Sequence, residues 1–111
     1  MRVIVCGSRG WADAGRIVER LAQLPGTATV VHGAARGADR LAADAARVLG
    51  LAVEPHPANW ALGNQAGFMR NEEMAARGAD LCIAFWDGSS RGTADMMQRA
   101  EEHGITVEVI V

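Results

Sequence analysis

The chain has 111 residues, 50% of them hydrophobic, which is enough for one compact domain with a modest core. Its formal net charge of −2 and pI of about 5.9 argue against a broad nucleic-acid-binding surface, because neutralising a long phosphate backbone requires a basic face. The apolar run near the N-terminus is too short for a signal peptide or a membrane span, so we expect a soluble, cytoplasmic protein.

The first half of the chain predicts two strand-loop-helix units in succession. A β-branched run at 2–10 ends in Gly and Ser and leads into a helical pattern over 13–26, with Asp13 as its cap. A second strand is expected near 27–32, followed by a Gly/Ala loop and a helix over about 39–49.

The second half continues the alternation. A third short strand is expected at 51–56, then a loop at 57–67 with some irregular turn, and then a helix over roughly 65–77. An almost wholly apolar run at 79–88 fits a central strand covered on both faces. The last run, at 105–111, carries polar residues at 106 and 108, as an edge strand does.

A fourth helix is expected over 93–103, with Thr93 as its cap. About five strands alternating with about four helices predict an α/β fold, an open parallel sheet between two helical layers. If the sheet is doubly wound in the order 3-2-1-4-5, strands one and four meet at the switch point, where ligands bind in this architecture.

The loops after strands one, two and four share one design: small residues that expose backbone amides, an Arg, and a helix that begins immediately afterwards. A helix N-terminus with free amides attracts phosphate or carboxylate, so three such loops on one edge predict a phosphorylated ligand. Arginines in and beside these loops make the positive potential local, which suits a nucleotide better than a polymer. The candidate ligand-binding residues are Gly7, Ser8, Arg9, His32, Gly33, Arg36, Gly37, Asp39, Asp87, Gly88, Ser89, Ser90, Arg91, Gly92 and Thr93.

Other interpretations of these residues stay open at this point. The loop glycines could merely supply tight turns, and His32 could hydrogen-bond the neighbouring loop rather than act as a general acid or base. Trp11, Trp60 and Trp86 could stack on a base or pack in the core or an interface. The two cysteines, which lie in apolar runs, are expected to be buried thiols. Neither a dinucleotide glycine pattern nor a Walker A motif is present.

The motifs GSRGW, HGAARGAD, HPANW, AGFMRNEEM, AD and SRGT, in this order, resemble the SLOG superfamily, in particular its YspA-like, cpYpsA-related branch. The resemblance covers nearly the whole chain. It implies a single Rossmann-like domain over residues 1–111 that binds a nucleotide or a nucleotide-derived small molecule. SLOG relatives are commonly homodimers, and we expect a homodimer with the third helix and the 57–67 loop in its interface.

The superfamily includes the Lonely Guy phosphoribohydrolases, which release a base from a nucleoside monophosphate, and DNA-processing protein A, which binds single strands. By similarity to the phosphoribohydrolase signature, Arg70 takes the Arg position, and the glutamate position falls on Met96, whose thioether cannot act as a base. Arg70 and Asp95 are therefore the catalytic candidates of an enzyme, with Glu72 or Asp39 as other carboxylates that could serve.

The leading hypothesis is a nucleotide-binding domain that acts as a sensor or sequesters its ligand, because the phosphate-binding loops are intact and the catalytic carboxylate is replaced. The alternative is a hydrolase that cleaves the N-glycosidic bond of a nucleotide. Single-stranded DNA binding is a third hypothesis, against which the low pI counts. No metal cluster is evident, and Mg²⁺ is the one cofactor that a phosphorylated ligand could bring.

Overall fold

The structure, a computed structural model that describes residues 1–111, is an α/β fold with a five-stranded sheet in the order β3-β2-β1-β4-β5. Every pair of neighbouring strands is parallel. The elements are β1 (Arg2–Gly7), α1 (Ala14–Leu21), β2 (Thr29–His32), α2 (Ala38–Val48), β3 (Ala52–Pro55), the 3-10 segment η1 (Trp60–Gln65), α3 (Ala66–Ala76), β4 (Leu81–Phe85), α4 (Arg91–Glu102) and β5 (Val107–Ile110). The predicted Rossmann-like open sheet and its strand order are confirmed.

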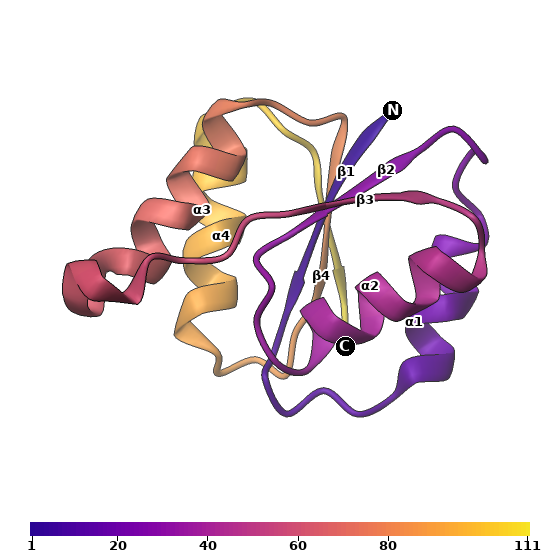
Figure 1. Ribbon diagram of the computed structural model, residues 1–111, viewed down its shortest axis with the longest axis horizontal. Helices are drawn as coiled ribbons and strands as arrows, with labels where there is room; N and C mark the ends of the chain where they lie inside the picture. The colour runs from indigo at the N-terminus through magenta and orange to yellow at the C-terminus, as the bar shows by residue number, and fades with distance from the viewer.

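The helices cover the two faces of the sheet in pairs. Helices α1 and α2 lie on one face, and α3 and α4 lie on the other (Figure 1). Segment η1, within the stretch expected to be an irregular loop, precedes α3 and forms the left end of the molecule in Figure 1. None of the helices combines the length and the apolar character needed to cross a membrane.

The core is divided between the two faces because successive side chains of a strand point to opposite sides of the sheet. Toward α1 and α2, Val3 and Val5 of β1 pack with Ile17 and Leu21 of α1, and all four are fully buried. Each fully buried side chain of this size contributes about 1.5 to 3 kcal/mol. This face is therefore a closed aliphatic core.

The other face is richer in sulfur. Ile4 and Cys6 of β1 pack there with Met74 of α3 and Met96 of α4. Cys82 of β4 joins them, with its Sγ 4.0 Å from that of Cys6, and both cysteines are free and buried, as expected. Methionine adapts its shape readily, so this core can accommodate an irregular neighbouring space.

Helix α4 begins earlier than expected, and the prediction that Thr93 caps it is wrong. Ser90 is the N-cap: its backbone is extended (φ −64°, ψ 117°), and its Oγ accepts a hydrogen bond from the Thr93 amide. Thr93 is consequently a buried residue of the first turn. The earlier start places the amides of Arg91 and Gly92 at the open end of the helix.

The other helix boundaries are close to the expected ones, with one exception. Helix α1 is capped by Asp13 as expected, but it ends at Leu21 rather than continuing toward residue 26. Leu24 lies in the following turn and still packs against the aliphatic core. The helical spacing of apolar residues thus continues to Leu24, beyond the end of the helix, because the turn after α1 keeps Leu24 on the side that faces the sheet.

Candidate functional site

One cavity lies at the carboxyl ends of β1 and β4, the strands that are neighbours at the switch point. Its volume is about 440 Å³, within the range of small-molecule sites. Of the residues predicted to bind ligand, those that line it are Gly7, Arg9, Asp39, Asp87, Ser90, Arg91, Gly92 and Thr93. Arg70, a catalytic candidate, lines it as well. The topology thus brings the loops after β1 and β4 and the start of α2 into one site.

The remaining predicted residues do not line this cavity. Gly33 and Arg36 line an adjacent hollow, and Ser8 lies at a smaller one behind the first loop. His32, Gly37, Gly88 and Ser89 belong to the same loops without lining any of these hollows.

The N-terminus of α4 forms one wall of the cavity. Asp87 accepts hydrogen bonds from the amides of Ser89 and Ser90, at 2.8 and 3.1 Å, which shapes the turn before the helix. The amides of Arg91 and Gly92 have no acceptor within the protein. Because the helix dipole adds partial positive charge at this end, the wall is suited to an anion.

Ser8 holds the loops of the site together rather than facing the cavity. It is 1% exposed, its amide donates to the Phe85 carbonyl at 2.9 Å, and its Oγ accepts from the Asp87 amide at 3.0 Å. Its carbonyl oxygen accepts from the amides of Trp11 and Ala38. Ser8 therefore joins the loops after β1 and β4 to the start of α2.

In the loop after β2, side chains of the protein occupy three of the backbone amides. Asp39 Oδ2 accepts from the Gly33 and Ala35 amides, at 3.1 and 3.3 Å. His32 Nδ1 accepts from the Ala34 amide at 3.0 Å, so His32 makes the loop contact that was one of its two interpretations. Burial, followed by the charge of Arg47, lowers the pKa of His32, and its Nε2 is buried without a partner.

Asp39 brings a buried carboxyl group to the cavity wall. The residue is only 6% exposed, and burial raises its pKa to about 6. The hydrogen bonds from Ala35 and Gly33 and the charge of Arg70 act in the opposite direction and only partly offset burial. Asp39 is thus a carboxyl group that changes its charge close to neutral pH at a ligand-sized cavity.

Arg70 of α3 connects the ends of β2 and β3 to the cavity. Its Nη1 donates to the Gly33 carbonyl and, at 3.4 Å, to the His56 carbonyl, while its Nε donates to Asn71 Oδ1 at 3.0 Å. Burial lowers its pKa, and the charge of Asp39 partly restores it. Its Nη2 has no acceptor within the protein, which leaves the two N–H bonds of this nitrogen available to a ligand.

The structure places the catalytic candidate Asp95 away from this cavity. Its Oδ2 accepts from Arg99 Nε at 2.9 Å and from Asn71 Nδ2 at 3.0 Å, so its carboxylate is held between α3 and α4. Glu72 is similarly engaged by Arg99 and His103. Met96, at the position of the phosphoribohydrolase glutamate, does line the cavity and is 1% exposed. Among the carboxylates considered for acid-base chemistry, only Asp39 lines the cavity.

The three tryptophans have different surroundings. Trp60 lines the cavity and is 58% exposed, which leaves a ring face open to a ligand. Trp11 packs on Phe85, with 5.5 Å between the ring centroids. Trp86 donates from Nε1 to the Ser90 carbonyl at 3.2 Å and packs against the sulfur-rich core.

Sequence reasoning missed cavity residues that come from the core and, apart from Arg70, those that come from α3. Cys6 and Met96 form part of its floor, and Gly67, Asn71 and Met74 line it from α3. These three α3 residues recur at intervals of four and three, so they share one helix face. That spacing was the available signal, but it predicts only a buried face, and the cavity beside it depends on how α3 packs.

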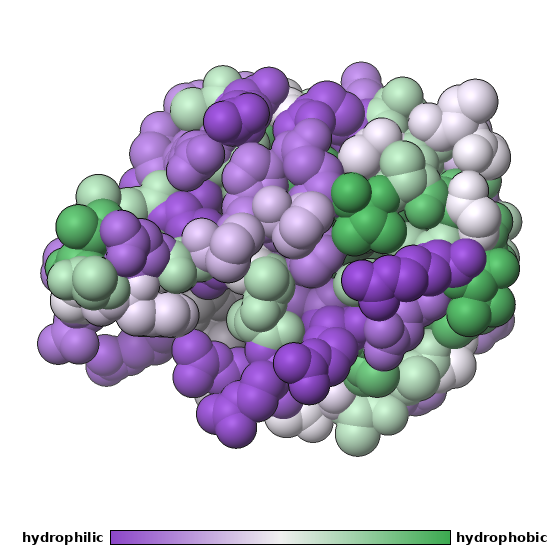
Figure 2. Space-filling model, in the orientation of Figure 1, coloured by the Kyte–Doolittle hydropathy of each residue, from purple (hydrophilic) through white to green (hydrophobic).

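The arginines divide into two groups by their partners. Those with a carboxylate partner are Arg2, Arg20, Arg47, Arg77 and Arg99. Those without one are Arg9, Arg16, Arg36, Arg40, Arg70 and Arg91. Apart from Arg70, which reaches the site from α3, the second group lies in the loops after the strands or in the first turns of the helices. Figure 2 shows hydrophilic side chains projecting along this lower edge of the molecule. Arginines without a carboxylate partner are therefore concentrated at the edge of the sheet that carries the cavity.

Comparison with known proteins agrees with the motifs. Residues 1–63 match the YspA, cpYpsA-related SLOG family. The chain is also 43% identical over 116 aligned positions to the Gene 61 protein of Mycobacterium phage D29, an alignment that covers 96% of this chain and 93% of that protein. The chain therefore belongs to the YspA, cpYpsA-related SLOG family.

Proposed function

We propose that this protein binds a nucleotide or a nucleotide-derived phosphorylated small molecule at the carboxyl edge of its sheet, as a sensor or a sequestering module. The observation that carries the proposal is the cavity that combines the N-terminal amides of α4 with Arg9, Arg70 and Arg91. Backbone amides at a helix N-terminus and guanidinium groups both bind phosphate in many proteins.

The rest of the cavity suits the nucleoside part of such a ligand. Met74, Met96 and Phe68 supply apolar surface, and Trp60 offers an exposed ring on which a base could stack. Asp39 and Asn64 supply polar groups that could pair with sugar hydroxyls or base edges. Membership of the SLOG family also supports a nucleotide-derived ligand, without specifying which one.

Isothermal titration calorimetry with a panel of nucleoside mono- and diphosphates tests this proposal. We expect at least one member to bind with a Kd well below about 1 mM. Arg91→Ala should weaken that binding about tenfold because it removes a guanidinium from the cavity wall. Arg40→Ala is the matched control: Arg40 is also an exposed arginine without a carboxylate partner, but it does not line the cavity. A panel in which nothing binds more tightly than about 1 mM would contradict the proposal.

One observation favours a second function, hydrolysis of the N-glycosidic bond of a nucleotide. The Asp39 carboxyl lines the cavity beside Arg70, and its pKa of about 6 suits a group that takes up and releases protons near neutral pH. In this reaction Asp39 would serve as the acid or base, and Arg70 would hold the phosphate. Asp95, held by Arg99, would have no direct part.

Incubation with nucleoside monophosphates, followed by chromatography for the free base, separates the two functions. Binding without release of base supports the first function. If base appears, and if both Asp39→Asn and Arg70→Ala abolish its release while circular dichroism shows a folded protein, the second function replaces the first. Met96 at the glutamate position is the reason for preferring binding alone.

We also propose a homodimer that uses η1 and the start of α3. Leu62 and Met69 are 56% and 52% exposed, and Figure 2 shows apolar surface at this end of the molecule. Exposed apolar patches of this kind are typical of interfaces. Light scattering at micromolar concentration should give the mass of a dimer, and Leu62→Glu should give a monomer. A monomeric mass for the unmodified protein would contradict this proposal.

A further inference from the structure

A second hollow adjoins the cavity and has a different chemical character. Its volume is about 540 Å³, and it lies beneath the loop after β2 and the segment that follows β3. Arg9, Ala35, Trp60 and Arg70 line both hollows. These shared residues show that the two spaces are neighbours with a common wall.

The lining of the second hollow contains cationic side chains and no carboxylate. Arg9, Arg36 and Arg70 line it, and no aspartate or glutamate does. The first cavity, in contrast, has Asp39 and Asp87 among its lining residues. Neither Arg9 nor Arg36 makes an ion pair or a side-chain hydrogen bond elsewhere in the protein. Like charges gathered in one concave space repel one another, and an anion bound among them relieves that repulsion.

The two hollows would recognise an anion by different groups. In the first cavity the free amides of Arg91 and Gly92 are available. Around the second hollow the amides of Gly33, Ala34 and Ala35 are already bonded to Asp39 and His32. The guanidinium groups that line this hollow are its source of positive charge. Arg36 is the arginine that lines the second hollow alone, and Arg91 is the one that lines the first alone.

We propose that the two hollows form one extended site for a ligand with two phosphoryl groups, of the class of a nucleoside diphosphate, rather than for a nucleoside monophosphate. The proposal rests on the proposed nucleotide-binding function and specifies its ligand class. One phosphoryl group lies against the N-terminus of α4, and the next lies toward Arg36. Arg9 and Arg70, which line both spaces, contact the bridge between them.

The test compares nucleoside mono- and diphosphate pairs, such as AMP with ADP and GMP with GDP, by titration calorimetry at constant ionic strength without added metal. We expect the diphosphate of the preferred pair to bind at least about tenfold more tightly. Arg36→Ala should remove this preference and leave monophosphate binding within about twofold. Arg91→Ala should weaken both members of the pair.

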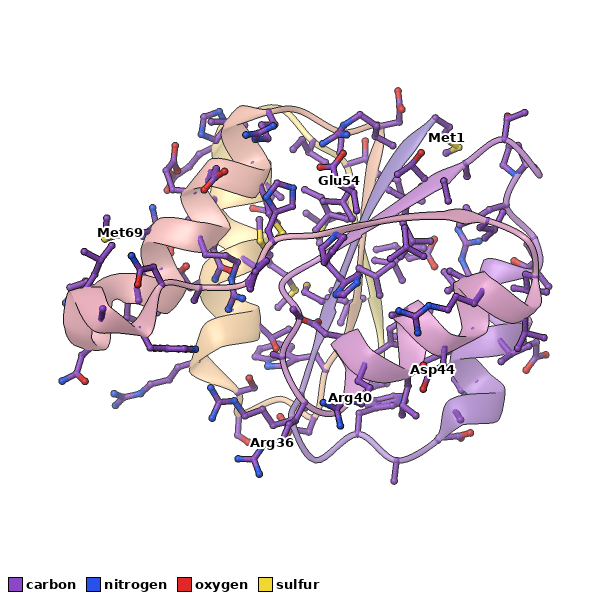
Figure 3. All side chains as sticks on the ribbon, viewed as in Figure 1. Met1, Arg36, Arg40, Asp44, Glu54 and Met69 are labelled. Carbon is purple, nitrogen blue, oxygen red and sulfur yellow. The ribbon has the colours of Figure 1, made fainter.

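Arg40→Ala controls for the general loss of one positive charge at this edge. Figure 3 shows Arg36 and Arg40 at the same lower edge of the molecule, and both are exposed, so neither substitution disturbs the core. Arg40 lines neither hollow, and its removal should preserve the diphosphate preference.

Three results would overturn the extended site: equal affinity for mono- and diphosphates, a preference that persists in Arg36→Ala, or an equal loss of preference in Arg40→Ala. In these cases monophosphate binding that is sensitive to Arg91→Ala would still support the proposed function. Absence of binding by every nucleotide would overturn both proposals.

Discussion

The loops after β2 and β4 resemble each other in sequence but present different groups to the ligand site. Each contains small residues followed by Arg-Gly, and in each an aspartate accepts hydrogen bonds from two amides of its own loop. Asp87 stands before its loop and leaves the first amides of α4 open. Asp39 stands after its loop, within α2, and occupies amides of the loop itself. Asp39 thus binds amides at the start of its loop, and Asp87 binds the amides that directly precede α4.

The two aspartates also differ in the direction of their pKa shifts. The Ser89 and Ser90 amides lower the pKa of the exposed Asp87 because hydrogen bonds to the charged form stabilise it. Asp39 accepts the same number of amide bonds, but burial outweighs them and raises its pKa to about 6. The comparison shows that desolvation, not the count of hydrogen bonds, sets the charge state at this site.

The largest difference between the loops should appear on substitution of their glycines. Gly37 precedes α2 with φ of +75°, and an added Cβ would lie 2.3 Å from the Arg9 carbonyl oxygen. Gly37→Ala should therefore destabilise the protein by about 3 kcal/mol or more through backbone strain and overlap. Gly92, in the first turn of α4, has nothing within 4 Å of such a Cβ, and Gly92→Ala should be neutral or stabilising by about 0.5 kcal/mol. Urea denaturation measures both, and similar losses in the two variants would show that the loops are equally constrained.

A smaller difference is expected for the aspartates. Asp39→Ala leaves the Gly33 and Ala35 amides without their buried acceptor and should cost about 2 kcal/mol at pH 7. Asp87→Ala should cost less, because water can replace its carboxylate at an exposed turn. Asp39→Asn, which keeps one acceptor oxygen, should recover part of the loss. A larger loss of stability for Asp87→Ala than for Asp39→Ala, measured by urea denaturation, would contradict this prediction.

The pH dependence of the unfolding free energy should show the smallest effect, and this effect is specific to Asp39. The pKa of Asp39 is raised from 3.8 to about 6 in the folded protein, so the folded state binds the proton more tightly than the unfolded state. Its contribution to stability is therefore fully present below about pH 4 and is lost as the pH rises through 6. The difference in unfolding free energy between the unmodified protein and Asp39→Asn should fall by about 1 to 2 kcal/mol from pH 4 to pH 7. Parallel pH profiles for the two proteins would show that Asp39 titrates normally.

Much of the site could be predicted because it follows from topology. Loops that leave parallel strands open on one edge, so Arg9, Asp39 and Arg91 could be assigned to one region before any contact was known. The catalytic candidate Asp95 shows the limit of this reasoning. Its place in the chain suggested the site, but its side chain points between α3 and α4 because Arg99 and Asn71 hold it there.

The apolar side of the cavity could not be predicted because it too depends on tertiary contacts. Met74, Phe68 and Trp60 reach it only because α3 and η1 pack beside the carboxyl ends of β1 and β4. The spacing of Gly67, Asn71 and Met74 indicates a buried face of α3, and a buried face has the same pattern whether it meets a core or a cavity. The distinction depends on side-chain volumes that meet across two elements.

The sequence by itself determined the α/β fold, the strand order and the edge of the sheet that carries the polar loops. These follow from periodicity along the chain and from the restricted connections of parallel strands, which are local or topological properties. Only the tertiary structure decided which loop amides remain free, which carboxyl group lines the cavity, and that a second cationic hollow adjoins it. Hydrogen bonding and burial change over distances of about an ångström, so they depend on how distant segments pack together.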